Sequence, residues 1–424
     1  MVIYMTADTF FTVSEVAHKL DLSIDTIRRW DKKGLIKSIR NANNYRLFSL
    51  EEVRRVQEKY TGTSAGRGFY VLQSEPTAYT SLELFAGAGG MALGFENAGF
   101  QSVMLNEFDK DATNTLRTNR PEWNVIQGDV RNIDFHDYRG KVDVVSGGFP
   151  CQSFSYAGHS RGFEDTRGTL FFDFARCVEQ VKPKIALGEN VKGLLNHDNG
   201  RTLAVMLRVL DGLGYNVRYQ VLKAQFHDVP QKRERLVIIG VRKDLDMPIY
   251  FPKEKNYILS LREAFENIPD SDGASYPKRK AEILEHVPAG GYWRDLPEDL
   301  QKEYMQKSYF LGGGKTGMAR RLAWEEPSLT LTCSPAQKQT ERCHPSETRP
   351  LNVREYARLQ TFPDDWEFTG SIASQYKQIG NAVPVNLAYH VGGCLIAMLD
   401  GKQLENDISV DNQEIELPYQ LELF

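Results

Sequence analysis

Cys151 is the side chain in this sequence best placed to act as a nucleophile. The segment Gly147-Gly-Phe-Pro150-Cys151-Gln152 directly follows a predicted strand, and Pro150 stiffens the approach to the cysteine. In open α/β sheets, ligands bind outside the carboxyl ends of the strands, so Cys151 would lie in a ligand crevice. A buried free cysteine is more often only a small hydrophobic side chain, so the neighbouring segments must decide between packing and chemistry.

A second segment has the composition of a nucleotide-binding loop. Phe85-Ala-Gly87-Ala-Gly89-Gly90 follows the first predicted strand and opens a helix, so its glycines let the backbone approach a ligand at the helix N-terminus. Glu107 follows twenty residues after Gly87, at the place for a carboxylate that binds ribose hydroxyls. The loop also satisfies a loose NAD-binding pattern, so by itself it leaves the cofactor open.

A sheet is needed to position these residues, and the pattern from Thr80 onwards predicts one. Apolar runs alternate with helical periodicity, which indicates an α/β fold with a doubly wound, mostly parallel sheet. The expected strands are Ser81–Phe85, Ser102–Asn106, Asn124–Gln127, Val142–Ser146, Ile185–Leu187, Val217–Leu222 and Leu236–Val241. Residues 242–345 lose this rhythm and predict a smaller, irregular second domain.

Six segments occur in a fixed order, and together they identify a family. They are Gly-Phe-Pro-Cys151-Gln-Ser-Phe-Ser155, Arg167-Gly-Thr-Leu-Phe171, Glu189-Asn-Val191, Gln231-Lys-Arg233-Glu-Arg235, Arg354-Glu-Tyr-Ala-Arg-Leu-Gln-Thr-Phe-Pro363 and Gln378-Ile-Gly-Asn381-Ala-Val-Pro384. This series resembles that of the DNA (cytosine-5)-methyltransferases, which include bacterial restriction-modification enzymes. The resemblance covers about residues 80–395 apart from the irregular region, and it implies a methyltransferase of Rossmann-like fold that uses S-adenosylmethionine.

The resemblance also implies a role for each catalytic candidate. Cytosine C5 is a poor nucleophile, so the Cys151 thiolate would first add to C6. Glu189 would supply an acid to the N3 edge, Arg235 would hold O2, and Arg233 would support the site or the DNA backbone. Because a base cannot react inside the duplex, the target cytosine would be flipped out, with the loop from Ser153 to Arg167 closing over it.

The same resemblance assigns the cofactor pocket. S-adenosylmethionine would lie over the glycine loop, with its ribose on Glu107 and its adenine against Phe108 and Asp129. The complete expected set is Phe85, Ala86, Gly87, Ala88, Gly89, Gly90, Glu107, Phe108, Asp129, Val130, Pro150, Leu170, Asn381 and Val383. No cluster of metal-ligand type is visible, and we expect no metal.

The first sixty residues predict a small helical module. Thr12 and Glu15 have capping-box spacing, a second helix carries Arg28 and Arg29, and a polar loop ends at Arg46. Two short helices with a tight turn suggest helix-turn-helix recognition of DNA, and the segment resembles the winged module of MerR-type regulators. We expect it to bind operator DNA, with the operator of its own gene as the first candidate. The alternative is a three-helix unit that only packs on its neighbour.

The expected organisation is therefore a chain of domains. The boundaries are 1–60 for the MerR-like module, 61–79 for a linker, 80–241 for the catalytic domain, 242–345 for target recognition, 346–400 for the return to the catalytic domain and 401–424 for an acidic tail. The expected DNA contacts are Arg28, Arg29, Arg46, Ser155, Arg320 and Arg321. Removing residues 1–75 should leave a folded catalyst.

Charge and cysteine content indicate which partners, metal sites and cellular compartments the sequence fits. The tail carries one lysine against six acidic residues and so contributes −5 to the net charge of −4, which leaves the rest of the chain at +1 and residues 1–60 at +3. Local basic surfaces can thus meet double-stranded DNA. Five widely spaced cysteines without a CxxC pair disfavour a disulfide framework or a zinc site and fit the cytoplasm. No segment predicts a membrane span; the most apolar one, 382–399, is expected to be a buried helix.

Three functions remain from the sequence. The first is methylation of cytosine C5 in duplex DNA, in partnership with a restriction endonuclease. The second is a DNA-binding transcriptional regulator whose methyltransferase domain is vestigial, against which the intact Cys151, Glu189 and Arg235 argue. The third is an RNA methyltransferase, which the helix-turn-helix module and the long recognition region disfavour.

Overall fold

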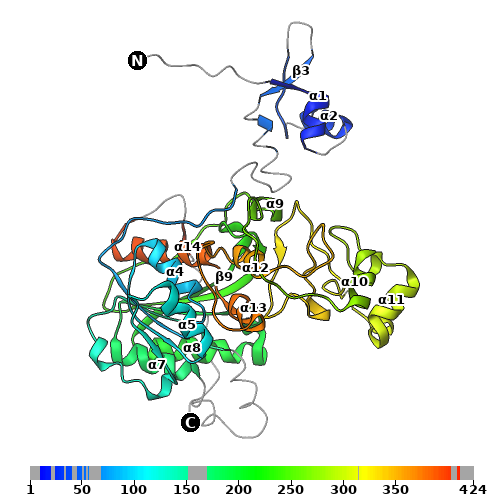
Figure 1. The fold of residues 1–424 in the computed structure, drawn as a ribbon. Helices are drawn as coiled ribbons and strands as arrows, with labels where there is room; N and C mark the ends of the chain where they lie inside the picture. Colours follow the sequence, from blue (N-terminus) through cyan, green and yellow to red (C-terminus); the bar gives the residue numbers. More distant parts are fainter. Residues whose placement is uncertain are drawn as a thin grey trace.

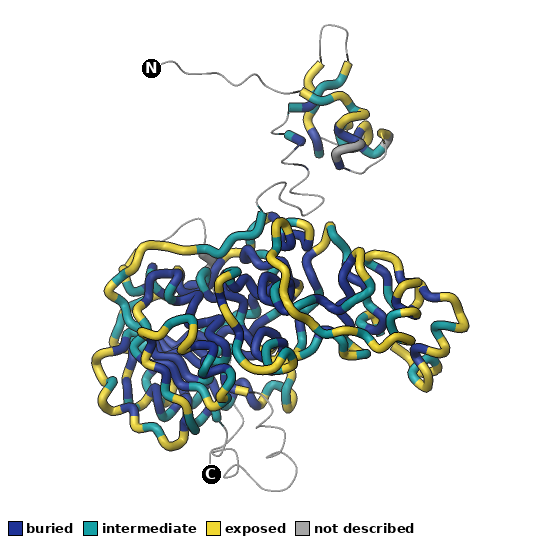
Figure 2. Tube along the Cα trace, in the orientation of Figure 1, coloured by how far each residue is buried: buried dark blue, intermediate teal, exposed yellow. Residues whose placement is uncertain are grey.

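The computed structural model describes most of the chain. The described residues are 10–20, 24–32, 35–40, 45–49, 52–53, 56, 68–150, 170–313, 315–402 and 408–410. Figure 1 shows the fold, and Figure 2 shows that the most continuously buried segments are the strands of the central sheet and the helices packed on them.

A seven-stranded sheet forms the centre of the catalytic domain. Its strands are β4 (Thr80–Leu84), β5 (Gln101–Glu107), β6 (Val125–Gln127), β7 (Val144–Gly147), β8 (Ile185–Val191), β9 (Tyr215–Lys223) and β11 (Glu234–Arg242). The order is β6-β5-β4-β7-β8-β11-β9, and only β11 runs antiparallel to its neighbours. The predicted doubly wound, mostly parallel sheet is confirmed. Phe85, expected to end the first strand, lies outside it because its φ of 61° turns the chain away.

Helices cover both faces of this sheet. From residue 90 onwards, the α-helices among the described residues are α4 (Gly90–Ala98), α5 (Lys110–Asn119), α7 (Leu170–Val181), α8 (Arg201–Gly212), α9 (Leu261–Ala264), α10 (Lys278–Glu285), α11 (Glu298–Met305), α12 (Val353–Leu359), α13 (Ile372–Asn381) and α14 (Val385–Leu399). On one face, α7 and α8 share a core with Leu82 and Leu84 of β4. On the other face, α4 and α14 pack over Leu187 and Val237.

Small residues let the C-terminal helix α14 approach α4 closely. A Cβ added at Gly94 would lie 2.4 Å from the Ala388 Cβ, and one added at Gly90 would lie 2.2 Å from the Val383 carbonyl oxygen. Only glycine fits at these two contacts. The packing therefore brings the Asn381–Val383 segment onto the glycine loop, although the two segments are far apart in the sequence.

The stretch Ile372–Leu399 is long and apolar enough to cross a membrane, with a mean hydropathy of 1.5 over its window. Two-thirds of that window (67%) is buried inside the fold, and the helix is broken between Asn381 and Val385. The expectation of a buried helix over residues 382–399 is confirmed.

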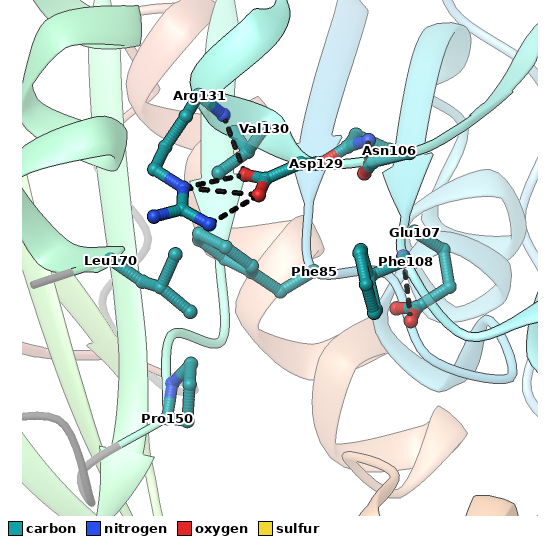
Figure 3. Close-up of a pocket in the computed structure, with 10 residues that line it drawn as sticks. Phe85, Asn106, Glu107, Phe108, Asp129, Val130, Arg131, Pro150 and Leu170 are labelled. Carbon is teal, nitrogen blue, oxygen red and sulfur yellow. Dashed lines mark hydrogen bonds and ion pairs between the residues drawn. The ribbon is translucent and has the colours of Figure 1, made fainter.

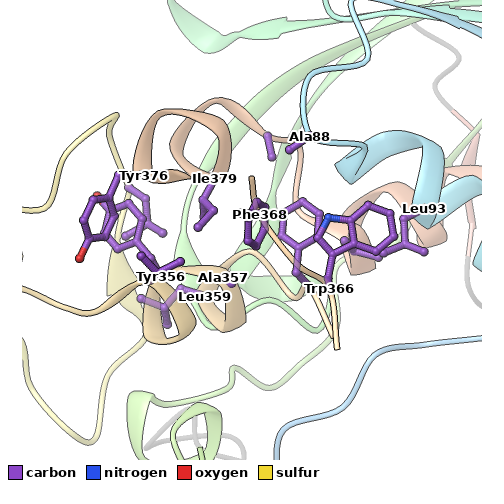
Figure 4. Close-up of a cluster of buried hydrophobic side chains, with 14 of the residues drawn as sticks. Ala88, Leu93, Tyr356, Ala357, Leu359, Trp366, Phe368, Tyr376 and Ile379 are labelled. Carbon is purple, nitrogen blue, oxygen red and sulfur yellow. The ribbon is translucent and has the colours of Figure 1, made fainter. Parts of the chain in front are cut away.

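A second core joins the glycine-loop side of the sheet to the C-terminal helices. Trp366 and Phe368 pack beside Leu93 of α4, while Tyr356 of α12 and Tyr376 of α13 stack edge to face (Figure 4). This core fixes α12 and α13 against the catalytic domain.

The recognition region has a core of its own that is smaller than predicted. Side chains from Ile283 to Ala319, with α10 and α11, form a separate apolar cluster. Tyr250 and Phe251 of β12 (Tyr250–Pro252), however, pack with α14 in the catalytic domain, where β12 pairs with β14 (Ile408–Val410). A short parallel pair, β10 (Gln231–Lys232) and β13 (Ser328–Leu329), connects the two parts.

The N-terminal module contains β1 (Phe10–Thr12), α1 (Val13–Lys19), α2 (Ile24–Lys32), β2 (Ile39–Arg40) and β3 (Arg46–Ser49). Its strands form an antiparallel sheet in the order β1-β3-β2, and its helices bury Val16 and Ile27. The capping box is confirmed: the Thr12 backbone N–H donates to Glu15 Oε2 at 2.7 Å, and the Glu15 N–H donates to Thr12 Oγ1 at 3.3 Å. The tip between β2 and β3 lies outside the described residues.

The linker predicted at residues 61–79 is shorter than expected, because residues 68–79 pack on the catalytic domain. The Leu72 N–H donates to Asn386 Oδ1 at 2.9 Å, and Asn386 Nδ2 donates to the Tyr70 carbonyl oxygen at 3.1 Å. The Tyr70 hydroxyl donates to buried Asp228, and Arg358 lies over the Phe69 ring at 4.6 Å. The segment from residue 68 is part of the catalytic core.

A pair of truncations tests this boundary. Removing residues 1–67 should leave the free energy of unfolding of the catalytic domain unchanged. Removing residues 1–75 should lower it by about 2–4 kcal/mol, since several hydrogen bonds and the ring of Phe69 are lost. Urea denaturation followed by circular dichroism measures both, and equal stability of the two fragments would contradict the packing described.

Candidate active site

Two neighbouring cavities open at the carboxyl edge of the sheet. The smaller, of about 390 Å³, is lined by residues that follow β4, β5 and β6, and Figure 3 shows them. The larger, of about 680 Å³, extends along the glycine loop to the ends of β8 and β11. Phe85, Glu107 and Pro150 line both cavities. One elongated ligand could therefore reach from the first cavity into the second.

The glycine loop has the backbone that a ligand cradle needs. Phe85, Gly87 and Gly89 all have positive φ, at 61°, 55° and 86°. The loop is anchored by the Ala86 N–H, which donates to the Asn106 carbonyl oxygen at 3.0 Å. A Cβ added at Gly87 would meet nothing within 4 Å, so the loop has open space above it.

Glu107 organises this loop from the end of β5. Its Oε2 accepts a hydrogen bond from the Gly87 N–H at 2.7 Å, while its Oε1 accepts from the N–H groups of Phe108 and Asp109 at 2.9 and 2.7 Å. The Phe108 ring is 74% exposed beside the smaller cavity. Such an exposed ring offers a flat apolar surface to a planar ligand.

Asp129 stands at the other end of the smaller cavity. It forms an ion pair with Arg131 at 2.5 Å and caps the turn that begins at Val130 (Figure 3). The Arg131 guanidinium lowers the pKa of Asp129 to about 2. Asp129 is therefore a fixed anion that can accept hydrogen bonds. Leu170 supplies an apolar wall.

Glu189 and Arg235 meet in the larger cavity. Strands β7 and β8 are adjacent, with Gly147 opposite Gly188, so the sequence that precedes Cys151 runs beside Glu189. Arg235 Nε lies 2.7 Å from Glu189 Oε1, and the two side chains are 11% and 12% exposed. Burial lowers the pKa of Arg235, and the Glu189 carboxylate acts in the opposite direction.

Asn190 connects this pair to the cysteine loop, because its Nδ2 donates to the Phe149 carbonyl oxygen at 2.9 Å. Pro150 follows Phe149 and lines both cavities. Cys151 and Ser155 themselves lie outside the described residues.

Gln231, Arg233 and Arg235 are all buried, whereas Lys232 between them is exposed, and Arg233 and Arg235 line the larger cavity. Arg233 is 1% exposed and donates to the carbonyl oxygens of Leu331, Gly380 and Ala382 at 3.0–3.2 Å. These bonds favour the first of the two roles expected for Arg233, support of the site, and the side chain also lines the larger cavity. Arg233 joins the recognition region to the Asn381 segment.

The segment around Asn381 completes the larger cavity. Asn381 and Val383 both line it, and the Cys333 thiol donates to Asn381 Oδ1 at 3.2 Å. Lys377 also faces the cavity and forms an ion pair with Asp109 at 2.9 Å.

All fourteen residues expected to bind the cofactor are described by the structure. Twelve of them line the two cavities: Phe85, Ala86, Gly87, Gly90, Glu107, Phe108, Asp129, Val130, Pro150, Leu170, Asn381 and Val383. Ala88 and Gly89 do not line them: Ala88 is in the apolar core, and Gly89 faces Leu116 and Trp366.

The expected DNA contacts divide into two groups. Arg28 and Arg29 are exposed on α2, whereas Arg46 forms an ion pair with Asp31 at 2.5 Å. Arg320 is partly exposed. Arg321 is 4% exposed and donates to backbone oxygens of the recognition region, including that of Val287 at 2.7 Å. The expectation that Arg321 contacts DNA is wrong, because it holds this region together from within.

Two groups that line or support the site were missed from the sequence. Glu83 lies in the middle of β4 and lines the larger cavity, and Asn190 fixes the loop before Cys151. An acidic residue inside an apolar strand was the available signal for Glu83. Among the residues the structure describes, no group of three or more His, Cys, Asp or Glu side chains could hold a metal ion.

The comparison with known families decides the identity. The model for C-5 cytosine-specific DNA methylases matches residues 79–397, about three quarters of the chain, and so includes every cavity residue above. The chain belongs to the C-5 cytosine-specific DNA methylase family. A C-5 cytosine methylase acts on DNA, which is thus the substrate. The MerR family model matches residues 12–48.

Three relatives of this methylase are type II methyltransferases. It is 58% identical to the type II methyltransferase M.Eco47II of Escherichia coli, over 92% of this chain and 96% of the relative. It is 53% identical to M.PspPI of Psychrobacter, over 93% and 97%. M.NgoPII of Neisseria gonorrhoeae is 35% identical over 77% of this chain and 99% of the relative.

Solved structures agree on the fold. A prophage-encoded DNA modification methyltransferase of Escherichia coli superposes with a TM-score of 0.56 at 25% identity, covering 76% of this methylase and 99% of that chain. The DNMT2 protein of Spodoptera frugiperda gives 0.55 at 17% identity, over 75% and 99%. The central fold is thus shared well beyond the range of clear sequence identity.

Proposed function

We propose that this methylase flips a cytosine out of duplex DNA and methylates its C5 through a covalent bond to Cys151, using S-adenosylmethionine. The observation that carries this proposal is the Glu189–Arg235 pair. It lies in a cavity that also contains the glycine loop, and Pro150, the residue before Cys151, lines that cavity. A restriction-modification role follows from the type II methyltransferases to which the chain is similar.

The two cavities fit S-adenosylmethionine. The smaller one offers an apolar ring at Phe108, an anion at Asp129 and an apolar wall at Leu170 for adenine. The carboxylate of Glu107 can accept hydrogen bonds from the ribose hydroxyls. The open space above Gly87 leaves room for the part of the ligand that extends from the ribose into the larger cavity. When bound, this group supplies the methyl that is transferred.

The protein's own residues would carry the remaining chemistry. The Cys151 thiolate adds to C6, which makes C5 nucleophilic enough to take the methyl group. Glu189 serves the N3 edge, where an acid favours this addition, and Arg235 holds O2 while it keeps Glu189 in place. Loss of the C5 proton and of the C6–sulfur bond then restores the pyrimidine ring.

Target recognition is assigned to residues 242–345. The cluster with its own core, from Ile283 to Ala319, stands apart from the cofactor cavities and is held to the catalytic domain through Arg233 and the β10–β13 pair. Partly exposed Arg320 belongs to the end of this unit. Arg320 remains a proposed DNA contact, and Lys315 and Lys338 are proposed as further contacts of this region.

Expression of the full chain in a host that lacks cytosine methylation, followed by bisulfite sequencing, tests the proposed function. We expect 5-methylcytosine at one short sequence throughout the genome. Unmodified DNA, with methylation of RNA instead, would contradict the proposal.

The cofactor assignment gives a separate prediction. Glu107→Ala and Asp129→Ala should each weaken S-adenosylmethionine binding by about 10- to 100-fold and leave DNA binding unchanged, because each removes acceptors for a polar ligand. Isothermal titration calorimetry measures the affinity. Glu122→Gln, a change at an exposed carboxylate outside both cavities, is the control. Unchanged affinity in both alanine variants would exclude this placement.

A second function is proposed for the N-terminal module, which we infer binds operator DNA and limits synthesis of the enzyme. The MerR family model matches it, and Arg28 and Arg29 are exposed on its second helix. M.NgoPII matches this chain over 99% of its own length but over only 77% of this chain, so methylases of this family exist without an equivalent of the whole chain. The module lies outside residues 79–397, which the methylase family model matches, and is proposed to serve a function other than methylation.

A mobility-shift assay tests the module with DNA from upstream of its own gene. Residues 1–67 and the full chain should shift this DNA, and Arg28→Ala with Arg29→Ala should abolish the shift while leaving methylation unchanged. If loss of the module alters the methylated sequence instead, it is an accessory of the catalytic domain.

A further inference from the structure

Asp228 is a buried acid that no step of the proposed mechanism uses. It lies between β9 and β10, three residues before Gln231, and its side chain is fully buried. Its φ of 56° is in the left-handed region, which costs energy for a residue with a Cβ. Such a backbone conformation persists only where the surrounding structure fixes it, and it is often found close to functional sites.

Four side chains from three distant segments hold the Asp228 carboxylate. Two of them follow β12: Lys255 Nζ pairs with Oδ2, and the Tyr257 hydroxyl donates to Oδ1. The Tyr70 hydroxyl, from the segment before β4, donates to the same Oδ1. His390 of α14 lies with its Nε2 2.7 Å from Oδ2. Both carboxylate oxygens are therefore satisfied by groups that are far apart in the sequence.

These partners keep Asp228 ionised. Burial acts to raise its pKa, but the hydrogen bonds from His390, Lys255, Tyr257 and Tyr70 outweigh it and place the pKa far below its usual range. Hydrogen bonds to a charged acceptor are stronger than those to a neutral one. Loss of the charge would also leave Lys255 without its counter-ion in a largely buried place. The carboxylate is therefore a fixed anchor and does not exchange protons at neutral pH.

The backbone around Asp228 is held by the same segments. Asn386 Nδ2 of α14 donates to the Asp228 carbonyl oxygen at 2.9 Å and to the Tyr70 carbonyl oxygen at 3.1 Å. The Lys255 N–H donates to the carbonyl oxygen of Phe226 at 3.0 Å, two residues before Asp228. The turn at Asp228 is thus fixed by the segment before β4, by the start of the recognition region and by α14.

This turn leads directly into the segment that carries the active-site arginines. Two residues separate Asp228 from Gln231–Arg235. Arg235 lines the larger cavity, where its Nε lies 2.7 Å from Glu189 Oε1. Because successive side chains of an extended segment point to opposite sides, a change of direction at the turn would move the Arg235 guanidinium relative to Glu189. Near the reacting atoms, a displacement of about 1 Å can reduce the rate by about 100-fold.

We propose that Asp228 is a positioning residue for methyl transfer, which fixes through its turn the placement of Arg235 against the target base. This inference rests on the proposed function and adds to it a residue that lies outside both cavities. It also assigns to Tyr70 a part in catalysis, although this residue belongs to the segment that joins the N-terminal module to the sheet. Neither residue lies in the six segments that identified the family.

Single-turnover methyl transfer by full-length Asp228→Gly tests the proposal, at saturating DNA and S-adenosylmethionine and at a temperature at which circular dichroism shows the variant folded. Glycine accepts the positive φ but removes the anchored carboxylate, so transfer should be about 10- to 100-fold slower than in the wild type. Affinity for S-adenosylmethionine should be unchanged. Asp228→Asn, which keeps one acceptor oxygen, should retain more of the rate than Asp228→Gly. A wild-type rate in Asp228→Gly would overturn the proposal, because the four contacts would then serve stability alone.

A milder pair of variants covers the case in which Asp228→Gly does not fold. Tyr70→Phe removes one hydroxyl donor and should slow methyl transfer by about 3- to 10-fold. Tyr79→Phe is the matched control, since its hydroxyl also donates to an aspartate, Asp400, at 2.7 Å, and neither residue lines the two cavities. Tyr79→Phe should transfer methyl groups at the wild-type rate. Equal rates in the two variants would contradict the role given to the Asp228 contacts.

A double-mutant cycle determines whether Asp228 acts through Arg235. If it does, Asp228→Gly should slow an Arg235→Ala enzyme by less than about 3-fold, because the guanidinium that the turn would place is already absent. An effect by another route would multiply with that of Arg235→Ala, and this result would overturn the proposal. Absence of methyl transfer to cytosine by the wild type would instead contradict the proposed function, on which the inference depends.

Discussion

Methyl transfer should fall to background in Cys151→Ala, while binding of DNA and of S-adenosylmethionine is retained. The substitution removes the proposed nucleophile and changes little else, because a methyl side chain takes the place of a thiol at the same position. Without addition to C6, C5 of cytosine does not become nucleophilic enough to take a methyl group. Transfer of tritiated methyl groups to DNA measures the rate.

Cys333→Ala is the matched control for this variant. Cys333 is an exposed cysteine that lines the larger cavity, and its thiol donates to Asn381. This variant should methylate DNA at a rate close to that of the wild type. Full activity in Cys151→Ala would exclude Cys151 as the nucleophile, and loss of activity in Cys333→Ala alone would assign that role to Cys333.

The second large effect is expected for Glu189→Gln. The amide keeps the shape and the contact with Arg235, but it cannot act as an acid toward N3. The rate of methyl transfer should fall by about 10²- to 10⁴-fold, which is the usual contribution of a general acid. Affinity for S-adenosylmethionine should stay within error of the wild type, because Glu189 lies at the end of the larger cavity assigned to the target base.

Glu234→Gln tests whether this loss is specific. Glu234 precedes Arg235 on β11, pairs with Lys192 at 3.0 Å and is 37% exposed. Removal of one exposed ion pair should cost little stability and no activity. If both variants lose activity equally, the loss in Glu189→Gln comes from removing a negative charge at this edge of the sheet. It would then not show that Glu189 acts as an acid.

The sheet was predictable because its strands are long apolar runs separated by helical periodicity. Ile185, Leu187, Val237 and Ile239 are buried as that pattern requires. Twelve of the fourteen residues expected to bind the cofactor line the two cavities, whereas Ala88 and Gly89 do not. The approach of Glu189 to the Cys151 loop depends on β7 and β8 being adjacent, which the sequence does not establish and the sheet order shows.

Side-chain partners were less predictable, because they depend on contacts between distant segments. Arginine commonly binds DNA, yet the side chains of Arg233 and Arg321 are buried and donate hydrogen bonds to backbone carbonyl oxygens. Residues 68–79 were assigned to the linker, yet Tyr70 and Leu72 bond to residues more than 150 positions away. Glu83 belongs to none of the six segments that identified the family, and only the fold shows that it lines the larger cavity.

A covalent trap tests whether Cys151 forms the proposed bond to the target base. Duplex DNA with 5-fluorocytosine at the methylated position should form a stable adduct with the wild type in the presence of S-adenosylmethionine, because fluorine cannot leave as the C5 proton does. Proteolysis and mass spectrometry should place the nucleotide on the peptide that contains Cys151. Absence of an adduct, or an adduct on a peptide that lacks Cys151, would contradict the mechanism.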